Sequence, residues 1–173
     1  KITVTGISVS LKTADTLVSD GNKIIIDASG MNSGSDLTFD GSKETNGDFL
    51  IIGSDGNDTI TGGQTSSSDE INGGNGNDSI SGGDGADTIV GGAGDDTLDG
   101  GLGSDSITSG SGNDSISGGA ANDTLVFGVN LTSSDTIDGG AGTGDILTFT
   151  DANGASDDLN RVTNVETITL GNA

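Results

Sequence analysis

The chain has 173 residues and a formal net charge of −22, and it contains neither histidine nor cysteine. Thiolate or imidazole metal sites, disulfides and Ser-His-Asp nucleophiles are therefore excluded, while the charge and the lack of an 18-residue apolar run predict no nucleic-acid partner and no membrane insertion. Ile, Leu, Val and Phe number only 39, and 24 of the 27 acidic residues are Asp, so we expect a divalent cation to stabilise a thin core.

The N-terminal flank, residues 1–52, reads as a series of short β-strands. Apolar and polar residues alternate between positions 2 and 11, as they do in half-buried strands. Further along, a short apolar strand followed by a turn of small residues recurs every thirteen residues, at 24–29, 37–42 and 50–54. This spacing predicts a β cap built of thirteen-residue rungs.

A nine-residue repeat fills residues 53–148, where ten units can be counted. Four consecutive units, starting at Gly73, read GGNGNDSIS, GGDGADTIV, GGAGDDTLD and GGLGSDSIT. Glycine takes the first, second and fourth positions, Asp the sixth, and Ile or Leu the eighth. The block contains 16 acidic residues and no Lys or Arg, so its carboxylates repel one another unless a cation neutralises them.

Each unit divides into a glycine-rich loop and a very short strand. The aliphatic residue at the eighth position is expected to point inward. Burying one aliphatic side chain contributes about 2 kcal/mol, whereas ordering nine residues costs about 1 kcal/mol or more for each, so we expect the metal-free chain to be loose or disordered. The predicted core residues are Ile60, Ile71, Ile80, Ile89, Leu98, Ile107, Ile116 and Leu125.

The C-terminal flank, residues 149–173, is predicted to close the repeat block with a second β cap. Residues 145–150 and the segment VETITL at 165–170 both have the composition of strands. The residues between them, 151–158, are polar and read as a loop.

The sixth-position aspartates are the candidate metal ligands. Ca²⁺ takes six to eight oxygen ligands, whereas Mg²⁺ demands a tighter octahedron, so clustered carboxylates and loop carbonyls favour Ca²⁺. If successive loops fall on opposite sides of a flattened coil, units two apart stack and each ion lies between neighbouring rungs. This arrangement predicts one ladder of Asp58, Asp78, Asp96 and Asp114, extended by Asp135, and another of Asp69, Asp87, Asp105 and Asp123, extended by Asp145.

These units resemble the RTX (repeats-in-toxin, haemolysin-type) family, whose signature is GGxGxDxUx. The resemblance implies an all-β fold, a right-handed parallel β-roll or β-helix of two units per turn. It also implies that Ca²⁺ is bound by the sixth-position Asp and by backbone carbonyls around the first and third positions. In this chain those carbonyls belong to Gly53, Asp55, Gly73, Asn75, Gly82, Asp84, Gly91, Ala93, Gly100 and Leu102. Ser109, Ala121 and the insertion 64–68 depart from the pattern.

Two classes of function remain open. The first is a secreted structural segment of the bacterial cell surface, of the surface-layer, adhesin or filament type, which folds and rigidifies on binding Ca²⁺; its β-rich ends could associate with copies of itself. VETITL also resembles the ends of RTX blocks in such proteins. The alternative is a noncatalytic secretion or folding module of a larger type I-secreted enzyme, such as a protease or polysaccharide epimerase. We expect no catalytic site, because the only three Glu residues lie far apart.

Overall fold

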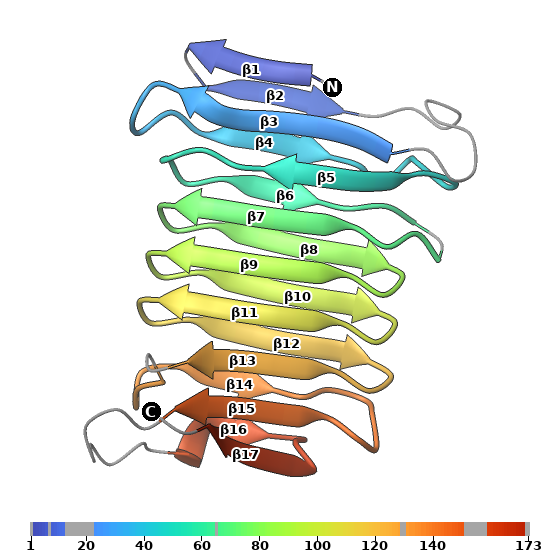
Figure 1. Ribbon diagram of the computed structural model, residues 1–173, viewed down its shortest axis with the longest axis vertical. Helices are drawn as coiled ribbons and strands as arrows, with labels where there is room; N and C mark the ends of the chain where they lie inside the picture. The colour runs from blue at the N-terminus through green and yellow to red at the C-terminus, as the bar shows by residue number, and fades with distance from the viewer. Residues whose placement is uncertain are drawn as a thin grey trace.

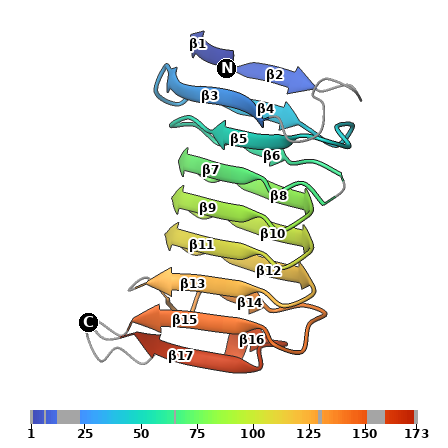
Figure 2. The same cartoon turned by 45° about the vertical axis from the view of Figure 1, so that its right-hand side comes forward.

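The computed structural model describes residues 2–6, 8–12, 23–64, 66–128, 131–150 and 159–171. The chain winds into a β-solenoid of about seven turns, in which two parallel sheets face each other (Figure 1). Successive strands alternate between the two sheets, so a full turn of the repeat block uses two nine-residue units. Turned by 45°, the molecule shows the same stack of rungs along its whole length (Figure 2).

The odd-numbered strands form a nine-stranded sheet in chain order. Its members are β1 (Ile2–Gly6), β3 (Lys23–Met31), β5 (Asp48–Ile52), β7 (Glu70–Asn75), β9 (Thr88–Ala93), β11 (Ser106–Ser111), β13 (Thr124–Gly128), β15 (Ile146–Thr150) and β17 (Thr167–Gly171). The even-numbered strands form the eight-stranded sheet. Its members are β2 (Val9–Lys12), β4 (Leu37–Asp40), β6 (Thr59–Thr61), β8 (Ser79–Asp84), β10 (Thr97–Leu102), β12 (Ser115–Ala120), β14 (Thr136–Asp138) and β16 (Val162–Thr163).

The period of the sequence sets the register of the sheets. Leu98 in β10 pairs with Ile80 in β8 and Ile116 in β12, each two units away. Because side chains alternate between the two faces of a strand, the Thr or Ser before and the residue after each eighth position turn away from the core. All eight predicted core residues are buried, none more than 2% exposed, which confirms their assignment.

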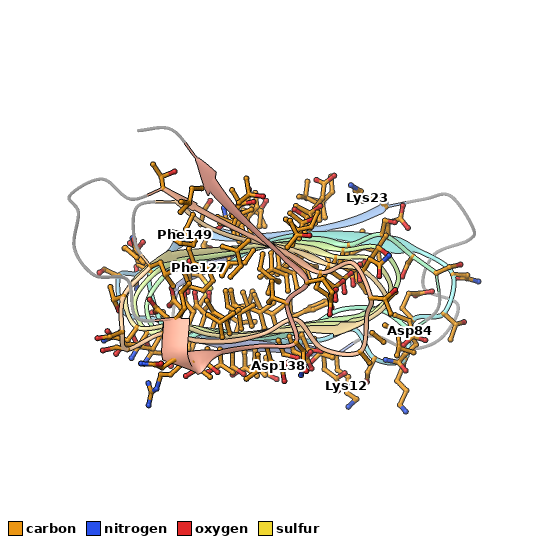
Figure 3. All side chains as sticks on the ribbon, turned by 90° about the horizontal axis from the view of Figure 1, so that it is seen from below. Lys12, Lys23, Asp84, Phe127, Asp138 and Phe149 are labelled. Carbon is orange, nitrogen blue, oxygen red and sulfur yellow. The ribbon has the colours of Figure 1, made fainter. Side chains whose placement is uncertain are left out.

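Larger apolar side chains fill the rungs outside the regular units. Ile26, Phe39 and Ile51, at spacings of thirteen and twelve residues, occupy the core of the N-terminal rungs. Phe39 and Phe49 meet edge to face, with ring centroids 5.0 Å apart. Toward the other end Phe127 and Phe149 are buried between the sheets, as the view along the solenoid shows (Figure 3).

The C-terminal flank contains one short element that the sequence did not indicate. A 3₁₀ helix at Leu159–Arg161 leads into the two-residue strand β16, which pairs with β14. The predicted loop 151–158 lies outside the described residues. Within the described ranges, no helical segment has the length and hydropathy needed to cross a bilayer.

Candidate metal centres in the turns

The sixth-position aspartates lie in the turns at the two lateral edges of the solenoid. The turns from odd to even strands follow one edge, on the left in Figure 1, and the turns from even to odd strands follow the other. All ten aspartates are buried, none more than 3% exposed. The first edge carries Asp58, Asp78, Asp96, Asp114 and Asp135, and the second carries Asp69, Asp87, Asp105, Asp123 and Asp145.

Hydrogen bonds join the aspartates of each edge into a ladder. The backbone amide of each one donates to Oδ1 of the aspartate in the next turn on the same edge, and the distance from Asp78 N to Asp96 Oδ1 is 2.9 Å. On the first edge the other three such distances are 2.8, 3.0 and 2.6 Å, and on the second edge all four are 2.8 Å. The carboxylates therefore align the turns of successive rungs.

Each ladder continues beyond the predicted aspartates. At the N-terminal end the amides of Leu37 and Phe49 donate to Oδ1 of Asp58 and Asp69, at 2.7 and 2.8 Å. At the C-terminal end Glu166 Oε2 accepts the amide of Asp145 at 2.9 Å. Glu166 was missed because the sequence search required Asp at this position. The signal was the Thr-Ile pair that follows it, which also follows several ladder aspartates.

A second, exposed ladder runs beside the buried one on the first edge, at the fifth position of each unit. The Asn57 amide donates to Asp36 Oδ1, the Asn77 amide to Asn57 Oδ1, the Asp95 amide to Asn77 Oδ1 and the Asn113 amide to Asp95 Oδ1, all at 2.8 or 2.9 Å. Asn and Asp recur at this position because their short side chains accept a hydrogen bond from the backbone of the next turn. These residues are structural and do not point into the buried site.

The second carboxylate oxygen distinguishes two kinds of turn among nine of the ten ladder aspartates; Asp114, whose Oδ2 is not among the buried unpaired oxygens, is assigned to neither kind. Oδ2 of six ladder aspartates is buried and has no hydrogen-bond partner among the described residues. Buried polar atoms are nearly always paired, so an unpaired carboxylate oxygen in turn after turn indicates a missing partner. We call these the open turns; their aspartates are Asp78, Asp87, Asp96, Asp105, Asp123 and Asp145.

Burial raises the pKa of five of these carboxyls, those of Asp78, Asp87, Asp96, Asp105 and Asp123. Loss of hydration, reinforced by the charges of Asp58 and Asp96, raises the pKa of Asp78 to about 7. Burial is also the main cause that raises the pKa of Asp87 to about 7, and those of Asp96 and Asp123 to about 6. The ladder hydrogen bond from the preceding aspartate opposes each of these shifts. A cation beside Oδ2 would restore the charged form, as bound metals do for their ligands.

Three other turns satisfy Oδ2 with the protein's own backbone. The Ser54 amide donates to Asp58 Oδ2 and the Gly63 amide to Asp69 Oδ2, each at 2.7 Å. The Thr132 amide donates to Asp135 Oδ2 at 2.6 Å. We call these the clasped turns.

The backbone at the second position of the unit distinguishes the open turns from the clasped turns of Asp58 and Asp69. In the open turns this glycine has a left-handed φ, for example 105° at Gly83 and 121° at Gly92, whereas Ser54 and Gly63 at the same position adopt no such φ. A left-handed φ is readily accessible only to glycine. In the two clasped turns at Ser54 and Gly63, the second-position amide is the group that reaches Oδ2.

Backbone carbonyls lie next to the open carboxylates. A Cβ built on Gly91 would lie 2.5 Å from Asp96 Oδ2 and 2.4 Å from the carbonyl oxygen of Ser109, the first residue of the unit one turn further on. The same crowding recurs beside Gly73, Gly82 and Gly100, so glycine at these first positions lets carboxylate and carbonyl converge. Of the predicted carbonyl ligands, those of Gly91 and Gly100 thus lie beside the open aspartates Asp78 and Asp87. Those of Gly73 and Gly82 lie beside the clasped aspartates Asp58 and Asp69.

The third-position carbonyls take part in bonds between turns. Ala93 O accepts the amide of Gly76 at 2.7 Å, and Leu102 O accepts the amide of Gly85 at 2.6 Å. A carbonyl oxygen has two lone pairs, so one remains for a cation. Within the described residues, the predicted carbonyls of Gly53, Asp55, Asn75 and Asp84 are not placed beside an open carboxylate.

The donor set fits a hard cation held mainly by the backbone. No three acidic side chains converge anywhere in the described part of the chain. One buried carboxylate oxygen for each open turn, with carbonyls beside it, is an all-oxygen environment, which suits Ca²⁺ and offers nothing to softer metals.

Comparison with known families identifies the repeat block. Residues 50–66, 64–98 and 99–129 match the model of the RTX calcium-binding nonapeptide repeat, which covers four copies. Residues 50–129 are RTX repeats. Neither the curated proteins nor the solved structures contain a match to the chain. RTX repeats imply Ca²⁺ as the ligand, and the unpaired buried Oδ2 atoms of the open turns fit that ion.

Proposed function

We propose that the protein is a noncatalytic, extracellular structural segment whose β-roll folds and rigidifies when Ca²⁺ binds in its turns. The observation that carries this proposal is the series of buried, unpartnered carboxylate oxygens along both edges of the solenoid. RTX β-rolls are generally structural modules of secreted proteins, which supports both the noncatalytic role and a position outside the cell or on a bacterial surface. The ligands are sixth-position aspartates together with first- and third-position carbonyls.

Calcium would act on folding because the metal-free turns are electrostatically unfavourable. Each open turn buries a carboxylate without a counter-charge, and the repeat block contains no Lys or Arg to supply one. Lys12, which pairs with Asp40, and Lys23, which pairs with Glu70, both lie N-terminal to the block. Binding of a divalent cation in the folded state alone stabilises that state.

The test is far-UV circular dichroism of the chain in chelator and during addition of Ca²⁺, with Mg²⁺ as the comparison. We expect a large gain of β structure with Ca²⁺ and a much smaller one with Mg²⁺, because Mg²⁺ requires a more regular octahedron. A chain with the same β content in chelator and in Ca²⁺ would contradict the proposal.

We propose a surface-layer, adhesin or filament role, with a module of a secreted enzyme as the alternative, and exposed apolar side chains on β1 and β17 support this proposal. Ile168 and Leu170 of β17 lie in register with the buried Leu147 and Phe149, yet they are 45% and 66% exposed. At the other end Ile2 of β1 is 45% exposed above the buried Ile26. The apolar columns of the core thus reach both ends, where the strands of another copy could continue them.

Light scattering during a calcium titration tests this assembly. We expect the particle size to grow with Ca²⁺, and the growth to be reduced by Leu170→Lys, which places a charge at the end of the column. The matched control is Thr169→Lys on the same strand. A strictly monomeric chain at saturating Ca²⁺ and high protein concentration would instead favour the secreted-enzyme module.

A further inference from the structure

We propose that calcium is required only by the open turns, and that the three clasped turns are metal-independent because a backbone amide occupies the place of the cation. This inference rests on the proposed calcium binding. It differs from the uniform pattern that the repeat implies, since Asp58, Asp69 and Asp135 then serve as structural acceptors and bind no ion.

The hydrogen bonds of the clasped turns leave no unsatisfied carboxylate oxygen. Asp58 accepts the Leu37 amide at Oδ1 and the Ser54 amide at Oδ2, both at 2.7 Å, and the Ser54 hydroxyl lies 2.7 Å from Oδ1. Two backbone amides and a hydroxyl thus satisfy both carboxylate oxygens of Asp58 without a metal. Asp78, the next rung on the same edge, has the equivalent bond at Oδ1 and none at Oδ2.

The same contrast appears on the opposite edge. Asp69 accepts the Phe49 amide at Oδ1 and the Gly63 amide at Oδ2, at 2.8 and 2.7 Å. Asp87, one turn further on, accepts the Asp69 amide at Oδ1, and its Oδ2 has no partner among the described residues. The change from clasped to open therefore occurs between the same two rungs on both edges.

The rungs at the N-terminal side of this change also have the stronger core. Leu37, Phe39, Phe49 and Ile51 are all buried to within 2%, where a regular unit offers one aliphatic side chain. Such burial stabilises the rungs without any ion. The rungs that contain β3 to β6 therefore form a template that exists without calcium, and the open turns wind onto it when calcium is added.

The turn of Asp135 places a third clasp near the other end. Its Oδ2 is bonded by the Thr132 amide, and Arg161 Nη1 donates to the carbonyl of Ser134 in the same loop, at 2.9 Å. On the first edge the open turns of Asp78 and Asp96 thus lie between the clasped turns of Asp58 and Asp135.

Calorimetry and native mass spectrometry of paired variants test the assignment. We expect Asp78→Asn to lose at least one bound Ca²⁺, and Asp58→Asn, one rung away on the same edge, to lose none. Asp87→Asn and Asp69→Asn form the matched pair on the other edge. A clasped variant that loses as many ions as its open partner overturns the inference, whereas a wild-type chain that binds no Ca²⁺ overturns the proposed function itself.

Amide hydrogen exchange of the wild-type chain in chelator tests the same assignment without a substitution that could unfold the protein. We expect the amides of Leu37, Phe49 and Ser54 to exchange slowly in chelator, and those of Asp96 and Asp105 to become slow only after Ca²⁺ is added. Equal exchange at both groups of amides in chelator overturns the inference. Slow exchange in chelator that is confined to the amides of Leu37, Phe49 and Ser54 supports the inference.

Discussion

Replacing Asp96 with Asn separates the two roles of an open aspartate. The amide side chain keeps the acceptor of the ladder hydrogen bond and removes the charged oxygen that a cation would bind. The Asn side chain retains Oδ1, which accepts the Asp78 amide in the ladder. It replaces the charged Oδ2 with a neutral NH₂ group beside the carbonyl of Ser109, to which this group can donate. We therefore expect Asp96→Asn to stabilise the metal-free fold and to weaken calcium binding.

The expected stabilisation of the metal-free fold follows from the pKa of the Asp96 carboxyl. Burial, with the charges of Asp114 and Asp95, raises the pKa of Asp96 from 3.8 to about 6. Each pKa unit corresponds to about 1.4 kcal/mol, so at pH 7.5 the charged group destabilises the metal-free fold by up to about 3 kcal/mol. Asparagine removes that penalty, and with it the oxygen that the cation would bind.

Osmolyte-induced folding in chelator measures how much Asp96→Asn stabilises the metal-free fold, since trimethylamine N-oxide favours compact states even where the metal-free chain is loose. The Asn variant should fold at a lower osmolyte concentration than the wild type, and in Ca²⁺ it should gain less stability against urea. Asp99→Asn in the following strand, β10, is the control, because it removes the same charge from an exposed position. An Asn variant that needs more osmolyte than the wild type, or that binds as much Ca²⁺, would refute this reasoning.

Three further results are expected. In chelator the β structure should increase on acidification, because the fold raises the pKa values of Asp78 and Asp87 to about 7 and those of Asp96 and Asp123 to about 6: the folded state then binds more protons, and its stability falls as pH rises through about 6 to 7. Circular dichroism between pH 7.5 and 4 checks the sign, and a fold that strengthens with rising pH contradicts it. Ile107→Ala should lower the free energy of unfolding in Ca²⁺ by about 2 to 5 kcal/mol, as measured in urea against Thr108→Ala, since Ile107 is fully buried. Gly91→Ala should abolish calcium binding at its turn, because the added Cβ would lie 2.4 Å from the Ser109 carbonyl; calorimetry that finds an unchanged number of ions would show that the site tolerates it.

The sequence predicted the core and the ladders because both follow from the period of the repeat. A constant spacing of nine residues places every eighth position on an inward face and every sixth position in a turn. The pairing of Ile80, Leu98 and Ile116 and the bond from Asp78 to Asp96 follow directly from that spacing. Such features depend on position alone and not on the details of any one turn.

The division into open and clasped turns depends on backbone geometry that a consensus does not contain. Ser54 at a second position was a readable signal, because a residue with a side chain avoids the φ near 105° that Gly83 adopts. Gly63 gave no such signal by its residue type; its unit differs by the insertion 64–68, which changes the loop. Ala121 departs from the consensus as well, yet it takes a φ of 84° and leaves the turn of Asp123 open.

Glu166 is the converse case: it takes the same place in the ladder as the aspartates, but its residue type differs from the repeat pattern. Its side chain is one methylene longer than that of Asp, and Oε2 still reaches the Asp145 amide at 2.9 Å. The surrounding residues kept the order of the repeat, so a search by role, for a carboxylate followed by Thr and an aliphatic residue, would have found it.

The dual role of the open aspartates explains why calcium and folding should be coupled in this chain. Oδ1 bonds the preceding rung, so the carboxylate must be buried in the turn for the solenoid to form. Burial leaves Oδ2 without water, and only a cation or a proton can then stabilise the side chain. The hydrogen bond at Oδ1 therefore joins neighbouring rungs, whereas the uncompensated charge of the same carboxylate opposes this packing when the ion is absent. In the clasped turns a backbone amide removes this conflict, which lets part of the solenoid hold its shape at any calcium concentration.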